Sequence, residues 1–151
     1  LMLERAFGSG ATQTVLGDIK LSGRIDRVDW ISQKDRTVRV VDYKTGKPKS
    51  ENEINGVVAT DEFSERELAL PSTIKGPYQR QLVFYKLLSE LDGQFPYVVE
   101  EGMFDFIEPK DPDSKLVRRI LPITQEAVTD LKNLIKEVIA ELRSLKFVEE
   151  W

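Results

Sequence analysis

The sequence predicts one α/β domain whose central sheet is flanked by helices. Its 151 residues match the length of a single domain, and a hydrophobic fraction of 40% is enough to build a core. Strand-like runs of apolar and β-branched residues share the chain with two long segments of helical periodicity. We therefore expect residues 1–151 to form one domain, and we find no internal repeat.

The N-terminal part of the chain predicts strands. Leu3 to Phe7 and Thr12 to Leu16 lie on either side of Gly-Ser-Gly, and we expect them to form a hairpin. Ile19 to Ile31 and Thr37 to Thr45 are stronger strand candidates, because Val, Ile, Tyr and Trp recur in them. The Ser-Gln-Lys-Asp segment between these two runs has the composition of a turn.

A polar segment and a helix follow. Residues 46–76 are rich in Lys, Pro, Ser, Asn and acids, which predicts a loop or insertion with a short helical piece near residues 64–70. Gly76-Pro77 is a typical helix start, and Asp92-Gly93 is a typical stop. We therefore expect a helix from Pro77 to about Leu91.

The C-terminal part predicts two strands, at residues 97–107 and 115–122, and a final helix. Thr124 is a good N-cap for that helix. Apolar residues recur along it at helical spacing and predict core packing along one stripe: Val128, Leu131, Leu134, Ile135, Val138, Ile139, Leu142 and Leu145.

The composition restricts the chemistry, because the chain contains neither cysteine nor histidine. Disulfides, thiolate or histidine metal sites, and Ser-His-Asp or Cys-His catalysis are excluded, so hydrolysis would need carboxylates, lysine, tyrosine or a metal held by oxygen atoms. No apolar run is long enough to cross a membrane and no signal peptide is recognisable, which predicts a soluble, cytoplasmic protein. The formal charge of −4 argues mildly against sequence-independent DNA binding.

Two of the predicted strands carry an aspartate where an apolar residue is expected. If the turn between them is symmetric about Lys34, Trp30 faces Val38 and Asp26 faces Asp42 on the same side of the sheet. Directly opposed β-carbons lie about 5 Å apart, and two carboxylates at such a distance repel by roughly 1 kcal/mol in water. A hard divalent cation between them, Mg²⁺ or Mn²⁺, would remove that repulsion and needs only oxygen ligands.

A purely structural interpretation of these acids stays open at this point. Asp26 can pair with Arg24, Arg27 or Lys44, and a slip of one residue in the register would turn it to the other face. Asp29 has the opposite parity to Asp26, so only one of them can join the second strand's acid. We expect Asp29 to be a surface acid.

Three ordered motifs at these positions resemble a known family. GRIDRVD at residues 23–29, VVDYKTG at 40–46 and QLVFY at 81–85 are similar to the PD-(D/E)XK nucleases of the RecB and AddAB type, which occur at the C-terminal end of UvrD/Rep-like helicases. The resemblance covers about residues 3–91. It implies the restriction-endonuclease-like fold, with a central mixed sheet flanked by the helices that begin near Pro77 and Thr124.

The resemblance also implies a role for individual residues. Asp26 and Asp42 match the family's metal-binding acids, and the backbone carbonyl of Tyr43 would be a further ligand of Mg²⁺ or Mn²⁺. Lys44 matches the catalytic lysine, whose ammonium would orient the attacking water and stabilise charge on the phosphate.

Residues beyond the DxK motif are expected to support the site or to meet DNA. Gln81 and Tyr85 match the family's QxxxY element and, at i and i+4, share one helix face, although Tyr85 could also simply pack in the core. DNA would first meet a small group of cations: Lys44, Lys47, Lys49 and Arg80.

The implied activity is metal-dependent DNA hydrolysis, as the exonuclease domain of a helicase–nuclease that processes DNA ends. The partners would then be DNA and a helicase domain or subunit, and this chain would be a fragment of a larger protein. Relatives usually add a His or Glu from a helix before the first strand, which this chain lacks, and Glu4 only resembles an early acid of some relatives. The alternative is therefore an inactive nuclease fold that binds DNA, or a protein partner through its acidic loop at residues 51–67.

Overall fold

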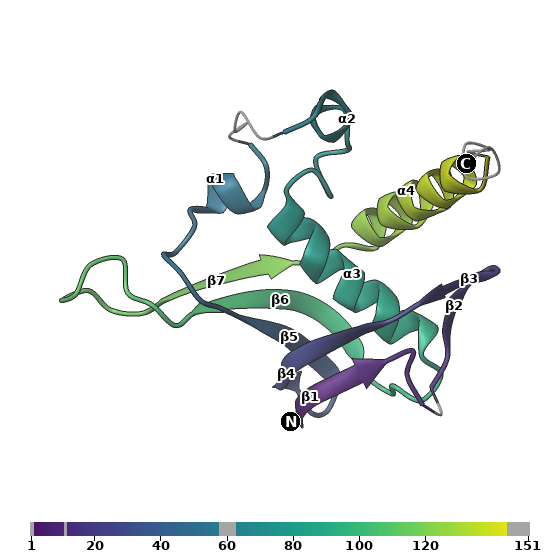
Figure 1. Cartoon of the computed structure of the whole chain (residues 1–151). Coiled ribbons are helices and arrows are strands. Elements are labelled where there is room, and N and C mark those ends of the chain that lie inside the picture. Colours follow the sequence, from purple (N-terminus) through teal and green to yellow (C-terminus); the bar gives the residue numbers. More distant parts are fainter. Residues whose placement is uncertain (1, 11, 58–62, 145–151) are drawn as a thin grey trace.

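A five-stranded mixed sheet forms the centre of the computed structural model, which describes residues 2–10, 12–57 and 63–144 (Figure 1). The strands follow the order β1 (Met2–Phe7), β4 (Gly23–Ser32), β5 (Thr37–Lys44), β6 (Val98–Phe106) and β7 (Val117–Pro122). β5 and β6 are parallel, and the other neighbours are antiparallel. A mixed sheet flanked by helices is the fold class that the sequence predicts.

The N-terminal hairpin was predicted with the wrong partners. β1 pairs with β4, whereas β2 (Thr14–Leu16) forms a separate two-stranded sheet with β3 (Ile19–Leu21). Leu16 lies opposite Ile19, so the loop between them is only two residues long, and its first residue, Gly17, has a φ of +64°. A two-residue loop with a left-handed glycine is a favoured hairpin connection, and it takes β2 away from β1.

The pairing of β4 with β5 follows the predicted register over most of its length. Trp30 faces Val38 and Val28 faces Val40, as a turn symmetric about Lys34 requires, and the register shifts by one residue only near Ser32. This ladder extends as far as the pair Arg27 and Val41. The chain beyond that pair contains Asp26 and Asp42.

The described part of the crossover from β5 to β6 contains three helices. Ser50 and Ser64 cap the two short helices α1 (Glu51–Ile54) and α2 (Glu65–Leu68) through capping boxes. The long helix α3 (Pro77–Leu91) has the predicted bounds. It packs close to the sheet at two glycines, because a β-carbon added at Gly102 would lie 2.8 Å from Leu82, and one at Gly23 would lie 2.6 Å from Leu88.

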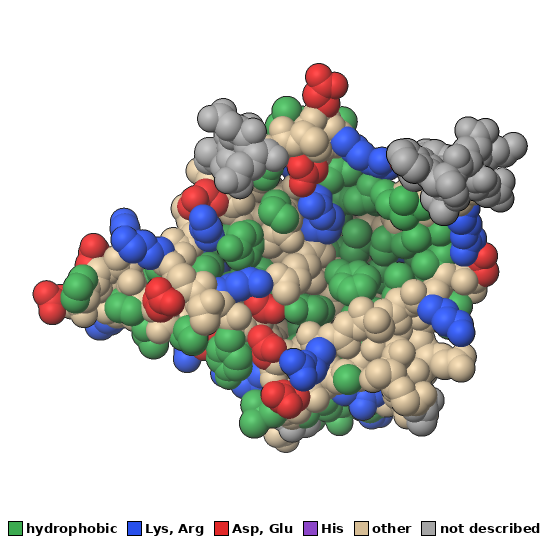
Figure 2. All heavy atoms as spheres, viewed as in Figure 1, with side chains coloured by type: hydrophobic (Ala, Val, Ile, Leu, Met, Phe, Trp, Pro, Cys, Tyr) green, Lys and Arg blue, Asp and Glu red, His purple; other side chains and the backbone are tan. Residues whose placement is uncertain are grey.

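The last helix, α4 (Gln125–Ser144), begins as predicted, with the Ala127 amide donating to Thr124 Oγ1 at 3.1 Å. Its apolar stripe packs on the core in the first half, where Val128 and Leu131 are buried. The prediction of core packing is wrong for Leu142, which is 57% exposed, and Leu145 lies outside the described residues. Figure 2 shows apolar side chains gathered on the face that α3 and α4 share.

The four helices of the described residues lie on the same side of the sheet in Figure 1. In the part of the chain that the structure describes, none of them is both long enough and apolar enough to cross a membrane. Because β5 side chains alternate between the two faces, Asp42 and Lys44 point toward α3 and Tyr43 points away from it. The sheet therefore has a helix-covered face and an opposite face, and the site described below uses both.

Shortening an apolar side chain of α4 should lower the free energy of unfolding by an amount that depends on how deeply the side chain is buried. Leu131→Ala should lower the free energy of unfolding by about 2 to 4 kcal/mol, because Leu131 is buried and leaves a cavity. Leu142→Ala, the matched control on the same helix, should cost under about 0.5 kcal/mol. Denaturant unfolding of the two variants measures the difference. Equal losses would mean that the distal half of the helix is also packed.

Candidate metal and catalytic site

Asp42, at the end of β5, is the most buried acid of the candidate site, with 4% of its surface exposed. Its Oδ1 accepts hydrogen bonds from the Tyr85 hydroxyl at 2.7 Å and from Gln81 Nε2 at 2.9 Å. Its Oδ2 is buried without a hydrogen bond of good geometry, but lies 2.8 Å from Lys44 Nζ as an ion pair. Asp42 is therefore held by α3 on one side and by its own strand on the other.

Gln81 joins the acid to the lysine. Its Oε1 accepts from Lys44 Nζ at 2.8 Å, while its Nε2 donates to Asp42 and to the Tyr85 hydroxyl. The i and i+4 spacing predicted from the sequence places both α3 side chains on the face that covers β5. Tyr85 is also a buried part of the core, so packing and support of the acid are combined in one residue.

Lys44 lies against two aromatic rings that the sequence analysis did not assign to the site. Its Nζ is 5.3 Å from the centre of the Tyr78 ring and 5.4 Å from that of Phe104, within cation–π range. Tyr78 precedes Gln81 by three residues on α3, a spacing that could have indicated its position. Phe104 enters through the pairing of β6 with β5, where it lies beside Asp42.

Asp26 reaches the site from β4, beyond the last pair of the ladder. Its Oδ2 accepts a hydrogen bond from the backbone N–H of Tyr43 at 2.9 Å. Within the described residues it forms no ion pair, and the neighbouring Arg27 pairs with Asp29 instead, at 2.9 Å. The arrangement of Asp26 thus differs from the structural alternative, in which an arginine would neutralise it.

Glu4 lies close to Asp26, on the edge strand β1. A cavity of about 520 Å³ is lined by Leu3, Glu4, Asp26 and Tyr43. Leu3 pairs with Arg27 and Arg5 pairs with Ile25, so the residue between them falls opposite Asp26. Glu4 has a φ of +52°, an unusual value for a residue with a side chain.

The residues present fit a hard divalent cation. The buried Oδ2 of Asp42 has the Lys44 ammonium as its partner but no hydrogen bond of good geometry, Asp26 opens onto the cavity, and every side-chain donor at the site that could bind a metal is an oxygen. In the ranges 2–10, 12–57 and 63–144, no group of three or more acidic, histidine or cysteine side chains could hold a metal ion. A cation here would therefore depend on two carboxylates, the Tyr43 carbonyl and water.

The cations predicted to meet DNA occupy different environments. Lys47 is exposed on the loop after β5, and Lys49 lies 3.9 Å from Glu53. Arg80 points into the crossover, where it donates to the carbonyl of Ile74 at 3.1 Å and lies 3.5 Å from Glu67. Arg80 is therefore held against the segment before α3. Of Lys47, Lys49 and Arg80, Lys47 is the most accessible to a phosphate.

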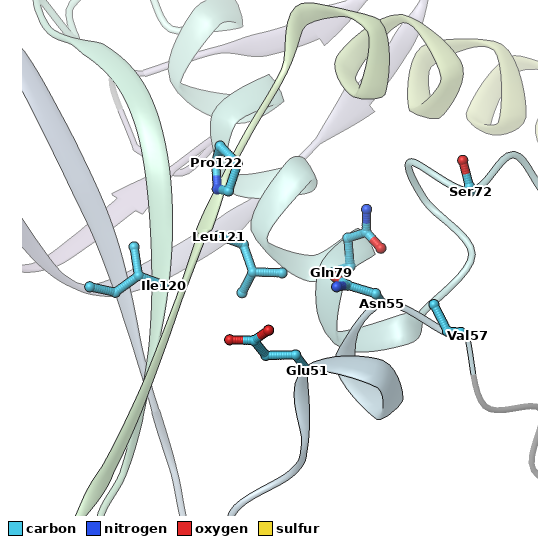
Figure 3. Close-up of a pocket in the computed structure, with 8 residues that line it drawn as sticks. All are labelled: Glu51, Asn55, Val57, Ser72, Gln79, Ile120, Leu121 and Pro122. Atoms are coloured by element: carbon cyan, nitrogen blue, oxygen red, sulfur yellow. The ribbon is translucent and has the colours of Figure 1, made fainter.

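A second pocket, of about 440 Å³, lies away from these residues (Figure 3). It opens between α1, the start of α3 and β7, and its lining is mostly neutral: Glu51, Asn55, Val57, Ser72, Gln79, Ile120, Leu121 and Pro122. Gln79 donates to the Thr73 carbonyl, and its Oε1 is buried without a partner. With Glu51 as its one acid and no base, this pocket lacks the groups that hydrolysis requires.

The electrostatics of the site favour a neutral Tyr85. Burial raises the pKa of its hydroxyl, and the hydrogen bond to Asp42 and the negative charges of Asp42 and Asp26 raise it further, against the opposing effect of Gln81. Tyr85 can therefore act as a hydrogen-bond donor to Asp42 throughout the neutral pH range.

Removing this hydroxyl should change how stability depends on pH. The folded protein holds the Tyr85 proton more tightly than the unfolded chain does, so this contribution is fully present below about pH 10 and falls as the pH rises further. Tyr85→Phe should cost roughly 1 to 2 kcal/mol at neutral pH, and the difference from wild type should shrink above pH 10. Unfolding curves recorded with a chelator from pH 7 to 11 test this. A constant difference would mean that the hydroxyl is not the buried donor to Asp42.

The comparisons with known proteins give one match. The family model described as the PD-(D/E)XK nuclease superfamily matches residues 1–150. No curated protein and no solved structure matches the chain.

Proposed function

Because the chain belongs to the PD-(D/E)XK nuclease superfamily, we propose that it hydrolyses phosphodiester bonds of DNA with the site around Asp42 and Lys44. One observation carries this proposal: a buried carboxylate and a lysine, two residues apart on β5, are held side by side by the same glutamine of α3. A purely structural ion pair would not need an acid beyond the ladder, such as Asp26, that opens onto a cavity also lined by Tyr43, the residue between Asp42 and Lys44.

The metal ligands would be Asp26, Asp42 and the Tyr43 carbonyl. A bound Mg²⁺ or Mn²⁺ would supply Lewis acidity at the phosphate and lower the pKa of a water molecule. The chain itself fixes the donors, since Tyr85 and Gln81 hold one oxygen of Asp42, and the Lys44 ammonium is the ion-pair partner of the other.

Lys44 would act on the phosphate and the attacking water. An ammonium has three N–H donors, and its contacts with Asp42 and Gln81 use two of them. The third donor can contact a non-bridging oxygen or the water, where a fixed positive charge stabilises the charge that develops. The rings of Tyr78 and Phe104 restrict the ammonium to this position without neutralising it.

We extend the proposal to the biological setting: an exonuclease domain of a cytoplasmic helicase–nuclease that processes DNA ends in recombinational repair. The net charge of −4 and the few cations near the site support a division of labour in which a helicase domain or subunit holds the DNA. Lys47 and Lys49 would then guide the strand locally, because they precede α1 on the loop that leaves the site.

A second candidate is an inactive nuclease fold that binds DNA or a protein. The ion pair between Lys44 and Asp42 favours it, since the lysine already neutralises the acid that a metal would need. The activity and metal experiments below distinguish the two candidates.

Substitution at the candidate site should remove activity without unfolding the protein. We expect Asp42→Asn and Lys44→Met to lower the rate of DNA cleavage in Mg²⁺ at least about a hundredfold, because each removes a charge required at the phosphate. Asp111→Ala, in the exposed loop between β6 and β7, is the matched control and should cleave like the wild type. Cleavage of a labelled linear duplex and of a single strand measures the rates. Activity in Asp42→Asn equal to that of the control would contradict the proposal.

Divalent cations should stabilise the protein in the absence of DNA. A cation at about ten times its dissociation constant adds roughly 1.4 kcal/mol of stability, which raises the melting temperature by about 3 to 6 °C. Mn²⁺ should act at lower concentration than Mg²⁺. Asp26→Asn can still accept from the Tyr43 amide, so it should keep the metal-free melting temperature and lose the response. A metal response of wild-type size in Asp26→Asn would remove Asp26 from the ligand set.

A further inference from the structure

The two candidate acids lie where the main-chain ladder no longer joins their strands. The pairing of β4 with β5 extends to Arg27 and Val41, and each candidate acid is the next residue outward on its strand. Regular hydrogen bonds therefore do not fix the separation of Asp26 and Asp42. Some other contact must hold β4 against β5 at this point.

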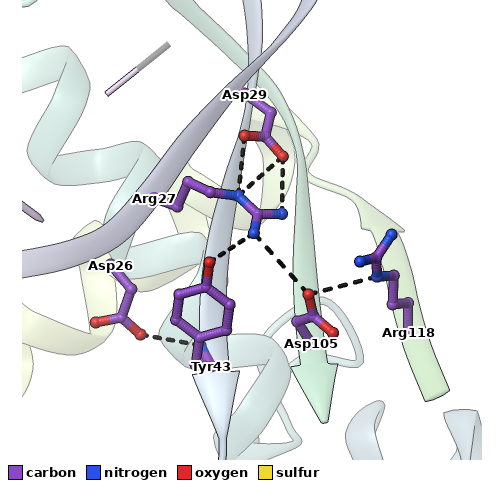
Figure 4. A network of polar contacts seen from close by, with 6 residues as sticks. All are labelled: Asp26, Arg27, Asp29, Tyr43, Asp105 and Arg118. Carbon is purple, nitrogen blue, oxygen red and sulfur yellow. Dashed lines mark hydrogen bonds and ion pairs between the residues drawn. The ribbon is translucent and has the colours of Figure 1, made fainter. Parts of the chain in front are cut away.

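Tyr43 supplies two such contacts, one on each face of the sheet (Figure 4). Its backbone N–H donates to Asp26 Oδ2 at 2.9 Å. Its hydroxyl accepts a hydrogen bond from Arg27 Nη1 at 2.6 Å, and the guanidinium also lies 5.3 Å from the centre of its ring. Tyr43 adjoins Asp42 and Arg27 adjoins Asp26, so the side-chain contact joins the immediate neighbours of the two acids.

Arg27 is fixed from the other side by two more acids. Its Nε and Nη2 both donate to the Asp29 carboxylate, at 2.9 Å each for the shortest contacts, and its Nη1 lies 4.0 Å from Asp105 on β6. Asp105 is 6% exposed and also lies 3.4 Å from Arg118 on β7. The guanidinium is thus anchored across three strands, and its side chain is only 22% exposed.

We propose that Arg27 and the Tyr43 hydroxyl form a clasp, on the face of the sheet opposite α3, that sets the separation of Asp26 and Asp42 for a divalent cation. This inference rests on the proposed function, and it makes Arg27 and Tyr43 positioning residues. Asp29 also acquires a role: sequence analysis treats it as a surface acid, whereas here it orients the arginine of the clasp.

If the clasp positions the acids, its loss should change the affinity for the cation more than the cleavage rate at saturating cation. Asp42 and Lys44 are held from the α3 side by Gln81 and Tyr85, and these contacts do not involve the clasp. Loss of the clasp should therefore loosen Asp26 and the backbone of Tyr43, and leave Asp42 and Lys44 in place. The affinity for the cation should fall, while the cleavage rate at saturating cation should stay close to that of the wild type.

Tyr43→Phe tests the clasp, because it removes only the hydroxyl. Tyr97→Phe is the matched control: its ring packs edge-to-face on Trp30 and Phe95, and its hydroxyl forms no hydrogen bond within the described residues. Mn²⁺ binding is measured by calorimetry without DNA, and cleavage is measured over a range of Mn²⁺ concentrations. We expect Tyr43→Phe to weaken Mn²⁺ binding roughly tenfold and to raise the half-saturating concentration equally, with Tyr97→Phe unchanged.

Two further measurements distinguish positioning from a general loss of structure. Arg27→Lys cannot bond Asp29 and Tyr43 together, so it should weaken Mn²⁺ binding like Tyr43→Phe, and the double variant should be no weaker than the single ones. Hydrogen exchange of the Tyr43 amide, whose acceptor is Asp26, should accelerate in Tyr43→Phe while amides in the middle of β5 keep their protection.

The outcomes separate this inference from the proposed function. If the wild type binds Mn²⁺ and cleaves DNA, unchanged affinity in Tyr43→Phe overturns the clasp, as does a lower saturated rate with unchanged affinity. If the wild type neither binds Mn²⁺ nor cleaves DNA, the proposed function is wrong. The clasp is then judged by hydrogen exchange alone: faster exchange of the Tyr43 amide supports it, and unchanged exchange overturns it.

Discussion

The carboxyl group of Asp42, enclosed between β5 and α3, is the constraint on which the rest of the site depends. An isolated carboxylate in such a place would cost many kcal/mol, so it requires partners of good geometry. Gln81, Tyr85 and Lys44 supply them at 2.7 to 2.9 Å. Contacts this short need α3 to be placed accurately on the sheet. The absence of side chains at Gly23 and Gly102 allows the helix to approach closely enough.

The residues of the site are held by different contacts on the two faces of the sheet. On the helix-covered face, Tyr85 and Gln81 donate to Asp42, and the Gln81 carbonyl oxygen and two aromatic rings hold Lys44. On the opposite face, Arg27 is held by Asp29 and Asp105 and donates a hydrogen bond to Tyr43. The alternation of side chains along β5 makes this possible, because consecutive residues present their side chains to different environments. Tyr43 is therefore held by a different set of contacts from its two neighbours, Asp42 and Lys44.

Much of the site could be predicted because its main parts are local in the sequence. The register of β4 with β5 follows from one short turn, and the i, i+4 spacing of Gln81 and Tyr85 follows from the helix period. Phe104 could not be placed in advance, because its position depends on the parallel pairing of β6 after a long crossover. The clasp between Arg27 and Tyr43 depends on where the ladder stops, and strand propensity does not encode that point.

The long crossover also has a consequence for the order in which the protein folds. β4 and β5 form a hairpin with a short turn, the kind of structure that forms in microseconds. In contrast, α3 reaches β5 across residues 45–76 and β6 reaches it across residues 45–97, so both contacts require a large loop to close. In a hairpin of β4 and β5 alone, Asp42 would be hydrated and would need no protein donor. Docking of α3 would exclude that water and present Gln81 and Tyr85 together, because both donors belong to the same helix. A chain stalled before this docking would expose the apolar face of β5 with a charge at its end, and that charge would oppose pairing with other chains.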